Sequence, residues 1–308
     1  MSPPTVKLTR PATEEIGPSA SPGEETAVSV VIPAYNEADH LAGQLLALGE
    51  VLESTGWSYE VIVVDDGSED GTCEAALTSG VRVLRHPRNR GYGAALKRGI
   101  EAARHDWILI TDADGTYPAS AIPRLLERAA ENEMVVGART TEKVQIPFSR
   151  RPAKWFLRWL ASYLAGQAIP DLNSGMRLMR RDLVERYRHL LPSRFSFTTT
   201  ITLAAACNGH AVEFVPIDYA ARLGESKIRP WDTYDFLLLI LRTIVFFNPL
   251  KVFIPLGAVL ALGGLAKFVY DVFIGNLSES AVLALLGALI VWAVGLLADQ
   301  NARIAMHR

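Results

Sequence analysis

Two aspartates separated by one residue, Asp112 and Asp114, follow the apolar run "WILIT" near the middle of the chain. On an extended chain, residues two apart project to the same side, so we expect both carboxylates to face one point. Like charges at this spacing repel each other unless a cation lies between them. Hard divalent cations prefer oxygen ligands and often bridge to phosphates. The triplet therefore predicts a site for Mg²⁺ or Mn²⁺.

Five apolar runs rich in Val and Ile alternate with segments of helical periodicity in the first 140 residues. The runs are 27–33, 59–65, 81–86, 107–112 and 134–139. Continuously apolar strands separated by helices are typical of a parallel sheet that is covered on both faces. We therefore expect an α/β, Rossmann-like fold with a mostly parallel sheet.

Polar clusters follow four of these runs. They read "PAYNE", "DDGSEDGT", "DADG" and "GART", after the first, second, fourth and fifth runs. Ligands of open α/β sheets bind outside the carboxyl ends of the strands. A solvated turn explains any one cluster, but the common placement of all four predicts a binding site at this edge.

The composition excludes some functions. The 308 residues carry a net charge of -2, which gives no electrostatic basis for binding nucleic acid. The two cysteines, Cys73 and Cys207, are too far apart for metal-ligand spacing and indicate a reducing compartment. Residues 1–25 are rich in Pro, Ser, Thr and Glu and lack an apolar segment. They predict a disordered tail rather than a signal peptide or an anchor.

Two apolar runs near the C-terminus, about 250–274 and 281–299, predict a pair of transmembrane helices. The second has no charge from Ala281 to Ala298, a length that crosses a bilayer. The first contains Lys267 and Asp271, four residues apart, which can pair on one helical face. A hairpin buried in a soluble protein is the alternative, although few soluble helices are apolar all round.

Charges around the hairpin predict its orientation. Basic residues flank both sides: Arg242, Lys251, Arg303 and Arg308. The loop 276–280 contains Glu279 and no base. Because basic residues favour the cytoplasmic side, both ends are expected there. We thus expect a multi-pass protein of the cell membrane whose preceding domain is cytoplasmic.

Four segments carry a family resemblance when taken together. "VSVVIPAYNEADHL", "VIVVDDGSEDGT", "HPRNRGYGAALKRGI" and "ILITDADGTYP" resemble the family-2 glycosyltransferases of GT-A fold, which use nucleotide-activated sugars. The resemblance implies that Asp66 contacts the base and that Asp112 and Asp114 are catalytic, holding the metal and the diphosphate. The donor-binding residues that it implies are Pro33, Tyr35, Glu37, Asp65, Asp66, Asp112, Ala113 and Asp114.

The second half resembles one branch of that family. "DLNSGMRLMRRD" (171–182), "FSFTTTITLAAACNGHAVEFVPIDYAARLGESK" (195–227) and the hairpin are similar to the dolichyl- or polyprenyl-phosphate sugar synthases. The residues that the resemblance assigns to the acceptor phosphate are Arg139, Arg158, Ser162, Arg222, Ser226 and Lys227. One departure is the pair Gly115-Thr116, where the branch has Leu-Gln after its aspartates. The branch's side-chain metal ligand at this position is therefore missing, and the Thr116 hydroxyl is the candidate to replace it.

Charge near the membrane supports an anionic acceptor. Residues 139–158 contain six bases among Pro, Phe and Trp, with Glu142 as the one acid. Basic side chains mixed with aromatic ones suit an anionic headgroup on an apolar tail. A surface that only attracts anionic lipid is the alternative. The segment 232–247 fits either an amphipathic helix at the interface or a core helix.

The expected organisation has four parts. They are a tail (1–25), a cytosolic GT-A domain (26–230), a juxtamembrane amphipathic helix (231–248) and a transmembrane hairpin (249–308). The expected activity moves one hexose from a UDP- or GDP-sugar to polyprenyl or dolichyl phosphate, with inversion. Membrane lipids are further partners.

Several alternatives stay open at this point. Asp171 is a candidate for orienting the acceptor or accepting a proton, and a structural role in holding Arg177 is the alternative. A second enzymatic hypothesis is that the sugar is transferred to another lipid or to a glycan. A non-catalytic module that binds a sugar nucleotide or a lipid headgroup is the third. The base, the sugar and the oligomeric state, including a homo-oligomer, are not determined by the sequence.

Overall fold

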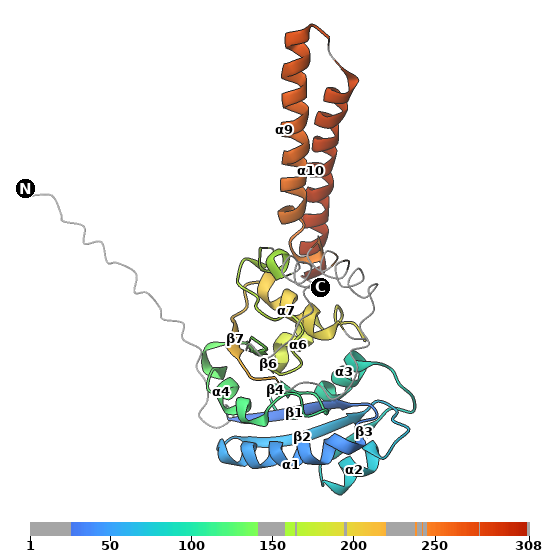
Figure 1. Cartoon of the computed structure of the whole chain (residues 1–308), viewed down its shortest axis with the longest axis vertical. Coiled ribbons are helices and arrows are strands. Elements are labelled where there is room, and N and C mark those ends of the chain that lie inside the picture. The colour runs from blue at the N-terminus through green and yellow to red at the C-terminus, as the bar shows by residue number, and fades with distance from the viewer. Residues whose placement is uncertain are drawn as a thin grey trace, which may run out of the picture.

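The computed structural model describes residues 26–140, 158–163, 165–193, 196–219, 238, 242, 245–276 and 278–306. Within these residues, a seven-stranded sheet is flanked by helices, and a hairpin of two long helices extends from one side of this domain (Figure 1). The predicted α/β fold with helices on both sheet faces and a C-terminal hairpin is confirmed.

The sheet is mostly parallel, as predicted. Its strands are β1 (Ala27–Ala34), β2 (Ser58–Asp65), β3 (Arg82–Arg85), β4 (Trp107–Ile110), β5 (Met134–Ala138), β6 (Arg177–Arg180) and β7 (Val212–Pro216). Their order is β3-β2-β1-β4-β6-β5-β7, and β6 alone among these strands runs antiparallel to its neighbours. Five strands match the predicted apolar runs, whereas the sequence analysis did not predict β6 and β7.

Helices cover both faces of the sheet. They are α1 (Ala38–Ser54), α2 (Thr72–Thr78), α3 (Tyr92–Ala102), α4 (Ile122–Leu126), α6 (Arg181–Tyr187) and α7 (Phe197–Cys207), with short 3-10 turns η1 (Ala119–Ala121) and η2 (Ala129–Glu131). One apolar cluster joins α1 and α4 to the sheet, and a second joins α3, α6 and α7 to it. The sheet is therefore buried on both sides.

Strand β1 shows why its sequence is apolar at nearly every position. Val30 and Ile32 belong to the cluster under α1, whereas Val31 belongs to the cluster under α3. Because successive side chains of a strand point to opposite faces, both sets must be apolar. A Cβ on Gly99 of α3 would lie 2.3 Å from Val31 Cγ1, so the glycine lets α3 approach the strand closely.

The end of β4 differs from its prediction. The strand ends at Ile110, and residues 113–114 form a turn instead of extended chain. Gly115 follows with a left-handed φ of 70°, and Thr116 N donates a hydrogen bond to Asp114 Oδ1 at 3.1 Å. The expectation that extended geometry aims Asp112 and Asp114 at one point was therefore wrong. The turn positions them instead.

The hairpin consists of α9 (Leu250–Ile274) and α10 (Glu279–Met306), both long and apolar enough to cross a membrane. Only 11% and 17% of their most apolar windows are buried. Because a hairpin in a soluble core would be mostly covered, the buried-hairpin alternative is wrong. The predicted pairing of Lys267 with Asp271 is confirmed, since Lys267 Nζ donates a hydrogen bond to Asp271 Oδ1.

Candidate active site

The loops that follow β1 and β2 form one rigid corner. Asn36 N donates to Ser68 Oγ at 3.0 Å, and Glu69 N donates to Asn36 Oδ1 at 3.0 Å. Glu37 N donates to Thr72 Oγ1 at 2.9 Å. Asn36 has a φ of 56°, a left-handed conformation that asparagine tolerates better than most residues. The segments "PAYNE" and "DDGSEDGT" therefore support each other at the carboxyl edge of the sheet.

Three predicted donor-binding residues lie in or beside this corner. Pro33 is buried within β1, where it pairs with Val64. Tyr35 is 43% exposed, and Glu37 is half-buried at the start of α1. Tyr35 thus presents an aromatic face to solvent at the edge where a ligand of this fold binds.

Asp66 is engaged inside the protein. It is 3% exposed, its Oδ1 lies 2.6 Å from His86 Nδ1, and it accepts hydrogen bonds from Arg90 N (3.0 Å) and Gly91 N (2.7 Å). Two backbone N–H groups of the segment "NRGYG" therefore bind a carboxylate of the chain itself. In this structure Asp66 holds the loop 86–91, and its contact with a base stays a prediction.

Asp65 also contacts its own chain. Its Oδ1 accepts a hydrogen bond from Ser68 N at 2.9 Å, and its Oδ2 lies 3.1 Å from Arg85 Nε. The side chain is fully buried. The Asp65 carboxylate thus stabilises the turn after β2, and its role in donor binding stays a prediction.

Asp112 is positioned by two other elements. Tyr92, the first residue of α3, donates its hydroxyl to Asp112 Oδ1 at 3.0 Å. Burial, and then the charge of Asp112, raise the pKa of Tyr92 well above its ordinary value, so the phenol stays a donor. On the other side, a Cβ on Gly175 would lie 2.6 Å from Asp112 Oδ2. Only glycine leaves room for the carboxylate at this place.

Asp114 is braced by its own turn. Thr116 Oγ1 donates to Asp114 Oδ1 at 2.6 Å, and Thr116 is only 3% exposed. Ala113, between the two aspartates, is buried. The Thr116 hydroxyl therefore orients the carboxylate, and direct ligation of a metal by Thr116 stays a prediction.

The donor set fits a divalent cation. Asp112 and Asp114 are half-buried, and the hydroxyl groups of Tyr92 and Thr116 hydrogen-bond to them. Among the described residues, no group of three or more His, Cys, Asp or Glu side chains could hold a metal. Mg²⁺ and Mn²⁺ suit two carboxylates when substrate phosphates and water supply the other oxygens.

A buried arginine supports the turn that faces Asp112. Arg177, on β6, is fully buried and donates to Thr198 O at 2.9 Å, to Thr202 Oγ1 at 2.8 Å and to Ser174 O. Burial lowers the pKa of Arg177 to about 10, so the side chain is still charged at neutral pH. This guanidinium therefore fixes the turn that contains Gly175.

Tyr117 ties the same turn to the aspartate loop. Its hydroxyl accepts a hydrogen bond from Gly175 N at 2.6 Å, and its ring packs edge-on against Tyr219 at 5.1 Å. Burial raises the pKa of Tyr117 to about 12, although Arg139 acts in the opposite direction. The phenol is therefore neutral at physiological pH.

Asp171 pairs with Arg139 and not with Arg177. Arg139 Nε and Nη2 donate to the two Asp171 oxygens at 2.7 and 2.9 Å, and Arg139 N donates at 3.1 Å. The expected structural contact with Arg177 was wrong, because Arg177 bonds to carbonyls and Thr202 instead. Burial alone would raise the pKa of Asp171, but the hydrogen bonds and charge of Arg139 hold it below its ordinary value.

The other predicted acceptor residues are less closely placed. Ser162 Oγ donates to Arg158 O at 2.8 Å and accepts from Ile169 N at 3.0 Å, so it braces its own helix. The Arg158 side chain is exposed. Arg222, Ser226 and Lys227 lie outside the described residues, as do 141–157 and most of 232–247.

Sequence reasoning missed three residues of this site, Tyr92, Tyr117 and Gly175, and it gave Arg177 the wrong partner. Each lies inside a segment that the sequence analysis quoted, but periodicity and spacing do not reveal which distant group it contacts. A glycine beside a serine, as in "NSGM", signals a close backbone approach without naming the partner. An arginine in an apolar strand signals an internal charge in the same way.

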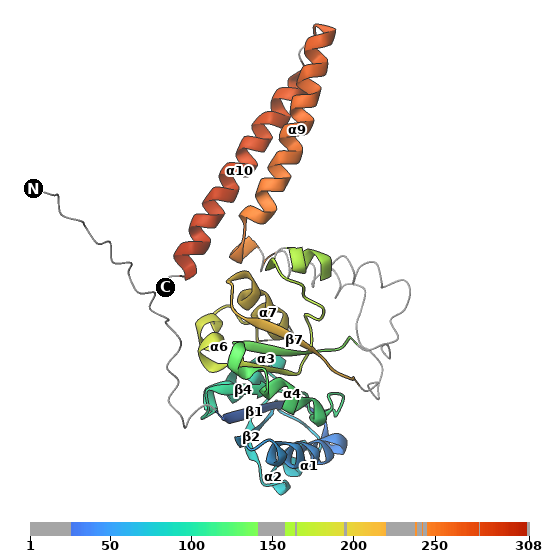
Figure 2. The same cartoon turned by 90° about the vertical axis from the view of Figure 1, so that its left-hand side faces the viewer.

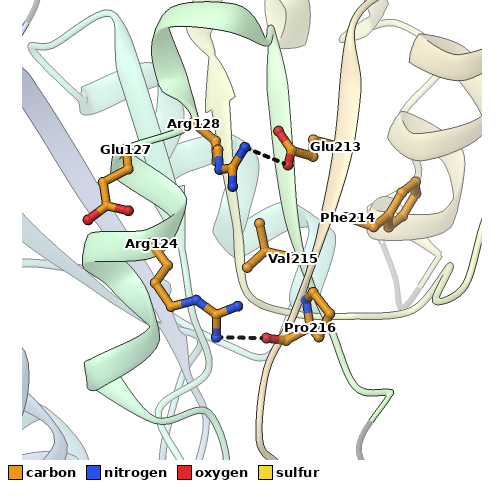
Figure 3. Close-up of a pocket in the computed structure, with 7 residues that line it drawn as sticks. All are labelled: Arg124, Glu127, Arg128, Glu213, Phe214, Val215 and Pro216. Atoms are coloured by element: carbon orange, nitrogen blue, oxygen red, sulfur yellow. Dashed lines mark hydrogen bonds and ion pairs between the residues drawn. The ribbon is translucent and has the colours of Figure 1, made fainter.

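A hollow between α4 and β7 lies apart from these residues. Figure 3 shows Arg124 reaching the carbonyl of Pro216 and Arg128 facing Glu213. Arg124 Nη1 donates a hydrogen bond to Pro216 O at 3.0 Å, and Arg128 Nη1 lies 3.5 Å from Glu213 Oε1. The cavity of about 110 Å³ is smaller than the pockets that hold drug-sized ligands. It contains none of the predicted site residues, and the arginines there contact groups of the chain itself.

Comparison with known families identifies the chain. The model described as "Glycosyl transferase family 2" matches residues 29–188, more than half of the sequence. The chain belongs to glycosyl transferase family 2. A second model, described as "GtrB C-terminal hairpin", matches residues 248–304 of this family 2 protein. The resemblances drawn from the sequence motifs are thus confirmed.

Solved structures share the GT-A fold. Glucosyl-3-phosphoglycerate synthase from Mycobacterium tuberculosis, in complex with Mn²⁺, UDP-glucose and phosphoglyceric acid, is 21% identical with a TM-score of 0.57. That similarity covers 74% of this chain and 85% of the synthase. Mannosyl-3-phosphoglycerate synthase from Rubrobacter xylanophilus is 22% identical with a TM-score of 0.56, covering 71% of this family 2 glycosyltransferase and 73% of that chain.

Proposed function

We propose that this family 2 glycosyltransferase transfers one hexose from a nucleotide sugar, UDP- or GDP-linked, to polyprenyl or dolichyl phosphate at the cytoplasmic face of the membrane. One observation carries the proposal. A family 2 domain and a solvent-exposed apolar hairpin that matches the GtrB type, the type of a polyprenyl-phosphate sugar transferase family, occur on the same chain. A transferase held at a bilayer is suited to an acceptor that is itself a membrane lipid.

The proposed donor site is the corner formed by the β1, β2 and β4 loops. Tyr35 and Glu37 would contact the nucleoside, with Asp66 at the base, and Asp112 and Asp114 would hold a Mg²⁺ or Mn²⁺ ion with the diphosphate. The ion would supply positive charge that stabilises the departing diphosphate. Similar folds that have been crystallised with Mn²⁺ and UDP-glucose support this assignment.

The proposed acceptor site begins where the donor site ends. Arg139 directly follows β5, and its partner Asp171 lies in the segment before β6. The same segment contains Gly175, which closely approaches Asp112. Arg139 would bind the lipid phosphate, together with Arg158, Ser162, Arg222, Ser226 and Lys227. Asp171 would position Arg139, because a carboxylate with a lowered pKa is a weak base at neutral pH.

Little proton transfer is needed for the proposed reaction. The phosphate monoester of the lipid is already anionic, so one of its oxygens attacks the anomeric carbon directly. The bond between that carbon and the diphosphate oxygen breaks, and the nucleoside diphosphate leaves with inversion of configuration. The chain would contribute positioning and charge stabilisation, which are the large terms in such a displacement.

The membrane arrangement is part of the proposal. Basic residues flank both ends of the hairpin, whereas the loop 276–280 has none. Because basic residues favour the cytoplasmic side, both ends would be cytoplasmic. Residues 26–230 would form the catalytic domain, 231–248 a juxtamembrane helix and 249–308 the transmembrane hairpin. Residues 1–25 would remain outside these units.

Transfer of radiolabelled sugar tests the proposal. Full-length protein in detergent is given polyprenyl phosphate with UDP-glucose, UDP-N-acetylglucosamine or GDP-mannose, with and without Mg²⁺ or Mn²⁺. We expect one donor to produce a lipid-linked sugar in a metal-dependent way, and Asp114→Ala to abolish it. Asp182→Ala, which removes an exposed carboxylate on α6, should leave it intact. Donor turnover without lipid product would refute the acceptor assignment and favour another lipid or a glycan.

A further inference from the structure

A short helix on the membrane side of the domain carries two exposed aromatic residues. Within residues 158–163, the rings of Trp159 and Tyr163 stack with centroids 5.8 Å apart and planes 12° apart. Each residue is 50% exposed. Because they are four residues apart, they share one face of the helix.

The opposite face of this helix is buried. Ala161 is fully buried and Ala165 is 9% exposed, and both belong to a cluster with Leu203 of α7. Residues two positions apart on a helix lie about 200° apart around its axis. The face that bears Trp159 and Tyr163 therefore points away from the domain core.

The same cluster fixes the level of the helix relative to the hairpin. Val252, in the first turn of α9, packs against it. The exposed apolar surface of α9 begins one turn later, with Ile254 at 52% exposed. Figures 1 and 2 both show the yellow-green helix on the side of α7 from which α9 and α10 extend. The aromatic pair thus lies near the level at which the exposed apolar surface of the hairpin begins.

The chemistry of the pair selects one occupant. Tryptophan and tyrosine combine an apolar ring with a polar N–H or O–H, and they are enriched at the headgroup level of membranes. The exposed Arg158 beside them adds a cation that attracts anionic lipids. We propose that Trp159 and Tyr163 insert into the headgroup layer and seat the catalytic domain against the bilayer. This inference rests on the proposed membrane anchoring of the chain.

Fluorescence quenching by brominated lipids tests the contact directly. The full-length protein is reconstituted in vesicles of phosphatidylcholine and phosphatidylglycerol, with bromine at a shallow acyl position to report on Trp159 and at a deep acyl position to report on Trp292, which lies midway along α10. The chain has six tryptophans, so each contribution is obtained by subtracting the emission of a Trp→Phe variant. Trp159→Phe reports the proposed contact, Trp292→Phe reports the hairpin, and Trp57→Phe is the control from the core under α1.

The expected result is that bromine quenches the emission of Trp159 and Trp292 and leaves that of Trp57 unchanged. Quenching of Trp292 without quenching of Trp159 would overturn this inference while leaving membrane anchoring intact. Absence of quenching at Trp292 would refute the anchoring itself. If Trp159 is not quenched and instead cross-links to a second copy of the chain, its exposed face is a protein contact, and the proposal is overturned.

A second measurement asks whether the contact matters for transfer. The double variant Trp159→Ala/Tyr163→Ala is compared with Leu46→Ala/Leu77→Ala, which removes exposed apolar side chains from α1 and α2. With a long-chain acceptor in vesicles, we expect the first variant to lose activity about tenfold and the second to keep it. With a short-chain, water-soluble acceptor, both should remain active. Equal losses with both acceptors would contradict a role in seating.

Discussion

At the scale of single residues, the site converges on Asp112. Tyr92 reaches it from the start of α3, and the Gly175 turn faces it from the segment before β6. Arg177 and Tyr117 hydrogen-bond to that turn from inside the domain and hold it in place. One carboxylate is therefore fixed from two directions by residues that need not touch the substrate. Such support would keep Asp112, the proposed catalytic carboxylate, within the small tolerance that displacement reactions allow.

Gly175→Ala should lower activity without unfolding the protein. The added methyl would lie 2.6 Å from Asp112 Oδ2, so the carboxylate must move. A displacement of about 1 Å can cost about 10²-fold in rate, and we expect a loss of kcat of that order. Gly49→Ala on α1 is the matched control, since a Cβ there meets nothing within 4 Å. An unchanged kcat in Gly175→Ala would show that Asp112 does not need its present position.

The Arg139–Asp171 pair predicts a particular dependence of stability on pH. Because the folded-state pKa of Asp171 lies below the ordinary 3.8, the ion pair stabilises the fold fully above that pH. Its contribution is lost as the pH falls below 3.8. Asp171→Asn should therefore cost about 3 kcal/mol in free energy of unfolding at neutral pH, and the difference from wild type should shrink in acid.

Thermal melting in detergent from about pH 7 to about pH 3 measures this difference. Asp182→Asn is the control, because its carboxylate is 65% exposed and should add no such dependence. A gap between wild type and Asp171→Asn that persists unchanged in acid would contradict the assignment of the ion pair.

Residue types were more predictable than their partners. Asp112 and Asp114 stood out because two carboxylates after an apolar strand need an explanation. The pairing of Asp171 with Arg139 depends on the turn that brings residues 32 apart in sequence together. No local pattern encodes this distance, so the sequence reasoning named Arg177 as the structural partner instead.

At the scale of elements, strands with uniform Val and Ile content were predicted and mixed strands were not. β1 and β4 are buried on both faces, so their sequences are apolar at nearly every position. β6 reads "RLMR" and β7 reads "VEFVP", and neither pattern separates a strand from a loop. β6 is a strand because β4 and β5 pair with it on both sides. This is tertiary context that intrinsic propensity does not contain.

Close packing of α9 against α10 depends on glycine. A Cβ on Gly257 would lie 2.2 Å from Trp292 Nε1, which donates to Ile254 O at 3.2 Å. Small residues allow helices to approach closely in membranes, where apolar burial alone gives little stabilisation. Gly257→Ala should therefore destabilise the hairpin by about 1–3 kcal/mol.

Melting of the detergent-solubilised protein measures this effect. Gly263→Ala on the same helix is the matched control, because a Cβ there meets nothing within 4 Å. Both variants raise the helical propensity of α9 equally, so only the steric effect separates them. Equal melting temperatures would mean that Trp292 rearranges at little cost.

At the scale of the whole molecule, the hairpin is built into the domain and is not a detached tail. Phe247 belongs to the cluster that covers one face of the sheet, and Val252 packs against the cluster of Ala161 and Leu203. If the hairpin crosses the bilayer as proposed, the direction in which α9 leaves the domain fixes how the domain faces the membrane.

This arrangement predicts which parts of the chain are reached from each side of the membrane. If both hairpin ends are cytoplasmic, the loop at its tip lies on the opposite face. Asn276→Cys, exposed after α9, should then be labelled in intact cells by a membrane-impermeant maleimide. Ser54→Cys, exposed at the end of α1, should be labelled only after permeabilisation. The native Cys73 is buried and Cys207 is partly buried, so their background should be low.

The reverse pattern would place the catalytic domain outside the cell, where nucleotide sugars and a reducing environment for Cys73 and Cys207 are absent. Labelling of both positions in intact cells would mean that the hairpin does not cross the membrane and lies on its surface. In that case the apolar faces of α9 and α10 would need to be buried by another contact, such as a second protein chain. The proposed transfer to a lipid phosphate at the cytoplasmic face requires the first pattern, because donor, metal and acceptor must meet on one side of the bilayer.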